Sequence, residues 1–117
     1  VFWNPPAKSP VGFLDVIVIV ECKNTGNPVG SQSVGWFVRK LQDRGVHTGV
    51  LVALSGITGG GSGQDNAHHE VLSALTRDKI KILLLSRQEI AGLTTTDGLA
   101  LLLKEKFLTL SLRLTVS

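Results

Sequence analysis

Several residue types are missing or scarce in this 117-residue chain, and each gap excludes a class of protein. There is one cysteine, Cys22, so no internal disulfide can form, which fits the reducing cytoplasm. The longest apolar runs are a few residues, far short of the roughly 20 that a membrane-spanning helix needs. No basic-then-apolar leader opens the sequence, and it contains no methionine. We therefore expect a cytoplasmic protein without membrane contact, and we expect the chain to be a fragment of a longer one.

The composition predicts one folded domain. Hydrophobic residues make up 43% of the chain and charged residues 18%, which is typical of a globular protein and excludes a disordered one. At this length the chain can form one hydrophobic core but not two, so residues 1–117 are expected to be a single domain. A formal net charge of +3 favours a polyanionic partner, although many ordinary domains are as basic.

Aliphatic runs indicate where the strands lie. The segments expected to be buried strands are residues 13–21, 48–55 and 79–85. Residues 1–3 are expected to form a short strand that pairs with the first of them as a hairpin, after a proline-rich loop. Residues 108–116 alternate apolar and polar side chains, which favours a strand and leaves a helix with a frayed end as the alternative.

Helical periodicity and capping residues predict helices after these strands. The first helix is capped by Ser31 or Ser33 and ends at Gly45. Its apolar stripe consists of Val34, Phe37, Val38 and Leu41. A second helix follows a glycine-rich loop, Ser86 opens a third through a capping box, and a fourth runs to Lys106. Strands that alternate with helices imply an α/β sandwich.

One strand carries the candidate chemistry. Its apolar run ends in Glu21, Cys22 and Lys23, and because side chains alternate, Glu21 and Lys23 point to the same side, about 7 Å apart along the strand. An acid and an amine are costly to bury there unless they pair or bind something. The Glu21 carboxylate and the Cys22 backbone carbonyl can hold Mg²⁺, which prefers oxygen ligands, while Lys23 orients an attacking water. The alternative is an ordinary surface ion pair at a strand end.

The residues around this strand carry a resemblance to a known family. They are Val18-Ile-Val-Glu-Cys-Lys-Asn24, Pro28-Val-Gly30 and the two later segments 49–58 and 80–93. Together they resemble the PD-(D/E)xK nuclease superfamily, in particular its Mrr-like restriction endonucleases. The resemblance implies a restriction-endonuclease-like three-layer α/β/α sandwich with a central mixed sheet. It also implies Mg²⁺- or Mn²⁺-dependent hydrolysis of phosphodiester bonds in DNA, with Glu21 as metal ligand and Lys23 assisting the water.

The family pattern also needs a second acidic metal ligand, an aspartate on the strand that pairs with the Glu-x-Lys strand. Asp15 is the nearest candidate, but it lies six residues before Glu21, which is about 20 Å along an extended strand and too far to share one cation. In a hairpin, residues near Val1 lie opposite Glu21. We therefore expect the second aspartate immediately before Val1 and a structural role for Asp15.

Polar residues near the strand end have two interpretations each. Gln32 sits where many Mrr-like proteins carry a polar residue that faces the site, but an exposed residue at a helix start explains it as well. Asn24 and Thr25 are turn residues first and phosphate contacts second. Four basic residues either contact a nucleic-acid backbone or lie on solvated surface: Lys8, Arg39, Lys40 and Arg44.

Other conspicuous side chains are assigned structural roles. His68 and His69 are adjacent, so they diverge on a helix and cannot bind one metal ion together. Cys22 is expected to be a buried, inert thiol because it follows the apolar run. Trp36 is expected to be a packing residue, since two tryptophans without a basic stripe do not form a platform for stacking bases.

Two functions remain open from the sequence. The first is a magnesium-dependent endonuclease that acts on DNA in restriction, defence or DNA processing, with a recognition domain or helicase elsewhere in the parent protein. Such an enzyme can act as a homodimer, and an apolar edge strand at residues 108–116 would supply the contact. The second is a catalytically inactive nuclease-like domain used for nucleic-acid binding or assembly, which the missing second carboxylate favours.

Overall fold

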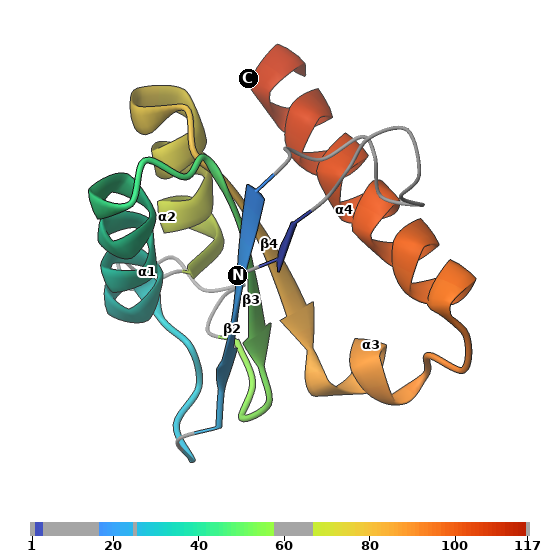
Figure 1. The fold of residues 1–117 in the computed structure, drawn as a ribbon. Coiled ribbons are helices and arrows are strands. Elements are labelled where there is room, and N and C mark those ends of the chain that lie inside the picture. Colours follow the sequence, from blue (N-terminus) through green and yellow to red (C-terminus); the bar gives the residue numbers. More distant parts are fainter. Residues whose placement is uncertain (1, 4–16, 25, 58–66, 117) are drawn as a thin grey trace.

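Three parallel strands form the centre of the molecule (Figure 1). The computed structural model describes residues 2–3, 17–24, 26–57 and 67–116. In the sheet, β2 (Ile17–Lys23), β3 (Thr48–Ala53) and β4 (Lys81–Ser86) lie side by side in that order. The predicted strands at residues 48–55 and 79–85 are therefore confirmed, as is the first from Ile17 onwards, while residues 13–16 lie outside the described part of the chain. Their register aligns the strand ends at one edge, where Lys23, Ala53 and Ser86 lie opposite one another.

A fourth, two-residue strand lies on the outer side of β2. This strand, β1 (Phe2–Trp3), runs antiparallel to β2 and pairs Phe2 with Val18 and Trp3 with Ile17. The pairing confirms the predicted N-terminal hairpin. It does not establish the mixed sheet that the family resemblance implies, because the three longer strands are all parallel.

Two helices cover one face of the sheet: α1 (Ser31–Asp43) and α2 (Ala67–Ser73) (Figure 1). The predicted stripe of α1 is confirmed, since its four residues are all buried. Gly49 of β3 lets this helix come close to the sheet, because a Cβ at that position would lie 2.7 Å from atoms of the Phe37 ring. The position of α1 over β2 and β3 is thus fixed by tight packing.

The start of α1 differs from the prediction. The N-cap is Gly30, whose carbonyl accepts the first helical hydrogen bond from the Val34 N–H at 3.2 Å. Ser31 and Ser33 therefore lie inside the helix and do not cap it. The end agrees with the prediction, because Gly45 follows the helix with a φ of 66°, a conformation that glycine adopts without strain.

After α2 the chain continues as a π-helical stretch, η1 (Ala74–Asp78), and then enters β4. α3 (Arg87–Ala91) follows β4 directly, and the predicted capping box is confirmed at its start. The Glu89 N–H donates to the Ser86 hydroxyl at 3.2 Å, and the Ser86 N–H donates to the Glu89 carboxylate at 2.9 Å. These two bonds satisfy backbone groups that a helix start would otherwise leave without a partner.

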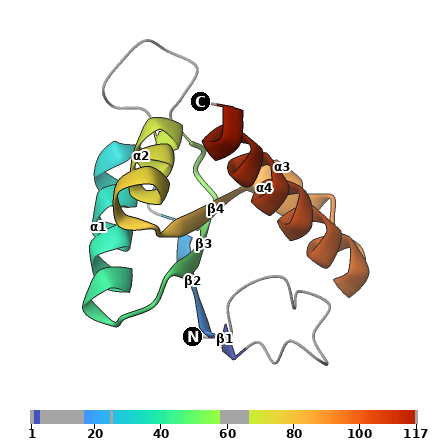
Figure 2. The ribbon, with the colours of Figure 1, turned by 90° about the horizontal axis from the view of Figure 1, so that it is seen from above.

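The final helix, α4 (Thr96–Val116), lies on the face of the sheet opposite to α1 and α2 (Figure 2). The predicted strand at residues 108–116 is therefore wrong. Its apolar positions are mostly leucine, a strong helix former, and the buried residues Leu103 and Leu110 are seven apart, which is helical spacing. Because residues 108–116 are helical, they do not form the edge strand that was expected to join two copies of the chain.

The hydrophobic core lies between the sheet and the helices on its two faces. Its side chains are almost all aliphatic, and Val34, Leu41 and Leu51 are fully buried. None of the described helices is both long enough and apolar enough to cross a membrane.

Candidate functional site

Glu21 and Lys23 meet at the end of β2, as the alternation of side chains predicts. The Lys23 Nζ atom lies 3.4 Å from Glu21 Oε2. Both residues share the face of β2 on which Ile19 is buried, the face that α1 covers, and the Glu21 side chain is 20% exposed. The acid and the amine therefore form one cluster at the border between core and solvent.

A third member of this cluster is Lys40 of α1, for which sequence reasoning left open a phosphate contact or solvated surface. Its ammonium group donates a hydrogen bond to Glu21 Oε1. Lys40 follows Phe37 by three residues, so it lies at the border of the buried stripe, and its chain reaches from there to β2. The position of Lys40 at the border of the buried stripe is a sequence signal for a contact with the sheet. Only the packing of α1 on β2 identifies Glu21 as the residue contacted.

The electrostatic setting keeps the Glu21 carboxylate ionised. Burial raises the pKa of Glu21, but the hydrogen bond from Lys40 and the positive charges of Lys23 and Lys40 outweigh burial. The net result is a pKa below the ordinary value of 4.5. At neutral pH the group is an anion with two oxygens, the form that a hard cation binds.

Cys22 is exposed, so the prediction of a buried thiol is wrong. β2 is also not buried on both faces, because Val20 on the same side as Cys22 is 50% exposed. The reason is the position of α4, which packs over β4: the Lys81 ammonium lies 4.9 Å from the centre of the Phe107 ring. On this face of β2, Val20 and Cys22 are therefore exposed, whereas Val18 is buried.

The Cys22 backbone carbonyl, predicted to be a metal ligand, points away from β3. The Lys23 carbonyl accepts a hydrogen bond from the Leu54 N–H at 3.0 Å, so it points towards β3. Successive carbonyls in a strand point in opposite directions, which directs the Cys22 carbonyl to the outer edge of β2.

The residues at the end of β2 provide some of the oxygen ligands that a divalent cation needs. The Glu21 carboxylate and the Cys22 carbonyl are oxygen donors of the kind that Mg²⁺ and Mn²⁺ bind. Within the described part of the chain, no three side chains of His, Cys, Asp or Glu come together as a metal site. Asp15 lies outside the described residues, as does the position expected for the second aspartate.

Gln32 lies near the start of α1, eight residues before Lys40. It is exposed and lines a groove of about 410 Å³ between α1 and the α2–η1 segment, together with Arg39. Trp36 lines the same groove and is 58% exposed, so the prediction that it is a packing residue is wrong. The accessory role of Gln32 stays a prediction.

The remaining candidates are dispersed. Asn24 and Arg44 are exposed, while Lys8 and Thr25 lie outside the described residues. His68 and His69 are both exposed on α2.

Sequence reasoning missed Arg87, the first residue of α3. Its Nε donates to the Leu54 carbonyl at 2.9 Å, and the Leu54 N–H donates to the Lys23 carbonyl. Arg87 is therefore held at the same edge of the sheet as Lys23. The signal was available in principle, because Arg87 directly follows a predicted parallel strand, and such strand ends meet at one edge.

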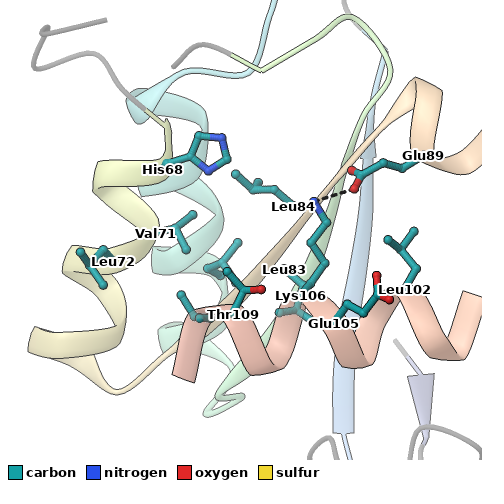
Figure 3. Close-up of a pocket in the computed structure, with 12 residues that line it drawn as sticks. His68, Val71, Leu72, Leu83, Leu84, Glu89, Leu102, Glu105, Lys106 and Thr109 are labelled. Atoms are coloured by element: carbon teal, nitrogen blue, oxygen red, sulfur yellow. Dashed lines mark ion pairs between the residues drawn. The ribbon is translucent and has the colours of Figure 1, made fainter. Parts of the chain in front are cut away.

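A separate cavity of about 360 Å³ lies between α2, β4 and α4 (Figure 3). Leucines of β4 and α4 form much of its wall, and His68 and the Glu89–Lys106 ion pair, 2.7 Å long, lie at its polar side. Glu21, Lys23 and Lys40 are not part of its lining. The cavity is thus distinct from the cluster at the end of β2.

A parallel α/β sheet with helices on both faces and a Glu-Cys-Lys strand end is compatible with a restriction-endonuclease-like nuclease domain. A family model described as a restriction endonuclease, that of the Mrr catalytic domain, matches residues 7–94. The match spans most of the sequence, so the chain belongs to this family, and the predicted Mrr-like relationship is confirmed. Searches of curated proteins and of solved structures found no match.

Proposed function

We propose that this domain is a magnesium-dependent endonuclease that hydrolyses phosphodiester bonds in DNA. The observation that carries the proposal is the cluster at the end of β2, where an ionised Glu21 lies 3.4 Å from Lys23 in a chain of the restriction endonuclease family. Families of this kind generally use divalent metal ions.

Each residue of the cluster has a role in this proposal. The Glu21 carboxylate and the Cys22 carbonyl hold Mg²⁺ or Mn²⁺ at the strand end, and a second carboxylate completes the site. A bound divalent cation supplies positive charge to the reacting phosphate and makes water a better nucleophile. Lys23 orients the attacking water and offsets the negative charge that builds up on the phosphate. By analogy with the family, the product carries a 5′-phosphate.

Basic residues at the strand ends are suited to hold the DNA backbone. Arg87 and Lys23 lie at the same edge of the sheet, whereas the exposed Arg44 lies between the end of α1 and the start of β3, towards the opposite edge. Guanidinium and ammonium groups position a phosphate chain without reading its sequence. Sequence recognition is then left to a separate domain or a helicase in the parent protein. We further propose a cytoplasmic location and a homodimer that cuts two strands, although the expected strand contact between copies is replaced by α4.

The test is cleavage of supercoiled plasmid DNA by the parent protein, which includes the position expected for the second aspartate, with Mg²⁺, with Mn²⁺ and with a chelator. Wild type is expected to nick DNA only with metal, and Glu21→Ala and Lys23→Met are expected to remove the activity. Glu105→Gln, which changes an exposed acid of α4, is the matched control and should cut as wild type does. Cleavage that persists in Glu21→Ala would contradict the proposal.

A specific observation favours a second function, a catalytically inactive nuclease-like domain that binds nucleic acid. Among the described residues, Glu21 is not part of any group of three His, Cys, Asp or Glu side chains that could hold a metal ion. This alternative predicts equal DNA binding with and without Mg²⁺, together with no cleavage of any substrate. Metal binding that depends on Glu21 decides in favour of the enzyme.

A further inference from the structure

The Glu21 carboxylate has an ammonium group on each of its oxygens. Lys40 binds Oε1, and Lys23 lies 3.4 Å from Oε2. A divalent cation that binds this carboxylate must use a lone pair on one of these oxygens, and it is repelled by both ammonium groups. The carboxylate has about four lone-pair sites, so the cation can bind beside a lysine, but its binding is favoured when one ammonium group withdraws.

The two lysines differ in how easily they can leave. Lys23 is two residues from Glu21 on the same strand, so the backbone holds the pair together. Lys40 reaches the carboxylate from another element, α1, through a flexible four-carbon chain, and its side chain is 41% exposed against 31% for Lys23. A change of rotamer moves the Lys40 ammonium into solvent without any shift of the helix.

We propose that Lys40 is a displaceable counter-ion of the metal site: it holds Glu21 in place in the metal-free protein and leaves Oε1 when a divalent cation binds. The inference rests on the proposed function, since it assumes that Glu21 is a metal ligand. Lys40 is a positioning residue in this scheme, because it acts on the ligand and not on the reacting atoms. Once released, its ammonium lies near the cation and is available to a phosphate of the substrate.

The first experiment is a calorimetric titration of the parent protein, which includes the position expected for the second aspartate, with Mn²⁺ in the absence of DNA. Lys40→Met is expected to bind Mn²⁺ about fivefold more tightly than wild type, because an exposed ion pair contributes up to about 1 kcal/mol that the metal no longer has to overcome. Lys40→Arg keeps the charge and should bind as wild type does. Lys104→Met removes an exposed lysine of α4 and controls for the change in net charge.

The outcomes separate the inference from the proposed function. Binding that is lost in Glu21→Gln but unchanged or weaker in Lys40→Met overturns the role of Lys40 and leaves the metal site intact. Binding that is unaffected by Glu21→Gln, or absent from wild type, overturns the proposed metal site and the inference with it. Tighter binding in Lys40→Met and in Lys104→Met alike also overturns the inference, because net charge then explains the gain.

A second measurement follows Lys40 itself by acetylation with a succinimidyl ester and mass spectrometry. In wild type, Lys40 is expected to react about threefold faster with saturating Mn²⁺ than without it, because a flexible side chain released from its contact with Glu21 is more accessible to the reagent. In Glu21→Gln it should react fast under both conditions, and Lys104 should not change. A Lys40 rate that Mn²⁺ leaves unchanged in wild type, while Mn²⁺ binding still depends on Glu21, overturns the inference.

Discussion

Two glutamate–lysine clusters in this fold resemble each other and differ in one instructive respect. Glu21 binds Lys40 of α1, and Glu89 binds Lys106 of α4 at 2.7 Å. In both, burial raises the pKa of the carboxyl, but the contributions of Lys40 and Lys23 at Glu21, and of Lys106 and Ser86 at Glu89, together outweigh it. Both pKa values therefore lie below the ordinary value of 4.5. Each cluster thus consists of a half-buried acid, at the end of β2 or in the first turn of α3, and a lysine from a neighbouring helix.

The two clusters differ in whether a backbone N–H group stabilises the carboxylate. Glu89 also accepts a hydrogen bond from the Ser86 N–H, which makes it part of a helix cap. Within the described residues, the groups that stabilise the Glu21 carboxylate are two ammonium groups. A cap bond is a fixed part of the fold, whereas a lysine can be exchanged for another cation. The comparison suggests that Glu89 serves the fold and that Glu21 is kept for binding.

The strongest test of this contrast exchanges each acid for its amide. Glu21→Gln is expected to lower DNA cleavage by roughly 100-fold or more, a typical cost of losing one electrostatic contact in a catalytic site. Glu89→Gln should leave cleavage within about twofold, because glutamine can keep the cap bond. Initial rates of plasmid nicking at saturating Mg²⁺ measure both. Equal losses in the two variants would remove the distinction.

Glycine substitutions test the packing that brings Lys40 to Glu21. Gly49→Ala places a methyl group against the Phe37 ring, where the contact would be 2.7 Å, and should destabilise the protein by about 1–3 kcal/mol. Gly92→Ala, near the Glu89 cluster, meets its nearest atom at 3.6 Å and should be close to neutral. Urea unfolding followed by circular dichroism gives both values, and a stable Gly49→Ala would show that α1 can shift.

Removing the cap tests whether the Glu89 cluster is structural. Ser86→Ala loses the hydroxyl that accepts the Glu89 N–H and should cost about 1 kcal/mol of unfolding free energy. Ser111→Ala, in the interior of α4, should change it by less than about 0.5 kcal/mol. Thermal unfolding of the two variants measures the difference. An undisturbed Ser86→Ala would contradict the assigned role of the cap.

The smallest expected effect is on acid stability. Because both carboxyls have a lowered pKa in the folded chain, each contributes stability that is complete above pH 4.5 and is lost as the pH falls through the folded-state pKa. Glu21→Gln and Glu89→Gln should therefore each flatten the fall in stability below pH 4.5, by less than about 1 kcal/mol for such exposed pairs. Midpoints of urea unfolding, measured at several pH values for wild type and both variants, show whether the loss of stability below pH 4.5 becomes smaller.

Local patterns made much of this fold predictable from the sequence. The buried stripe from Val34 to Leu41 and the Ser86–Glu89 capping box depend on spacing within one element, as does the placement of Glu21 and Lys23 on one side of a strand. The last part of α4 was ambiguous because alternating leucines suit a strand as well as a helix, and burial of Leu103 and Leu110 decided it.

The residues that sequence reasoning missed, or whose surroundings it left open or predicted wrongly, all depend on contacts between elements. Lys40 and Arg87 have partners on other elements, Glu21 and the Leu54 carbonyl. Trp36 and Cys22 are exposed because of where the neighbouring helices lie, and nothing in their local sequence reports that. Spacing along the chain determines which residues share a face, but it does not determine what that face meets.

The alignment of strand ends has a consequence for how ionic strength affects the protein. Lys23 ends β2 and Arg87 follows β4, so these two cations are about two strand spacings, or roughly 10 Å, apart. That separation allows each to neutralise a different phosphate of one DNA strand. Each neutralised phosphate releases bound counterions, so together the two should contribute about −1.8 to the slope of log affinity against log salt concentration.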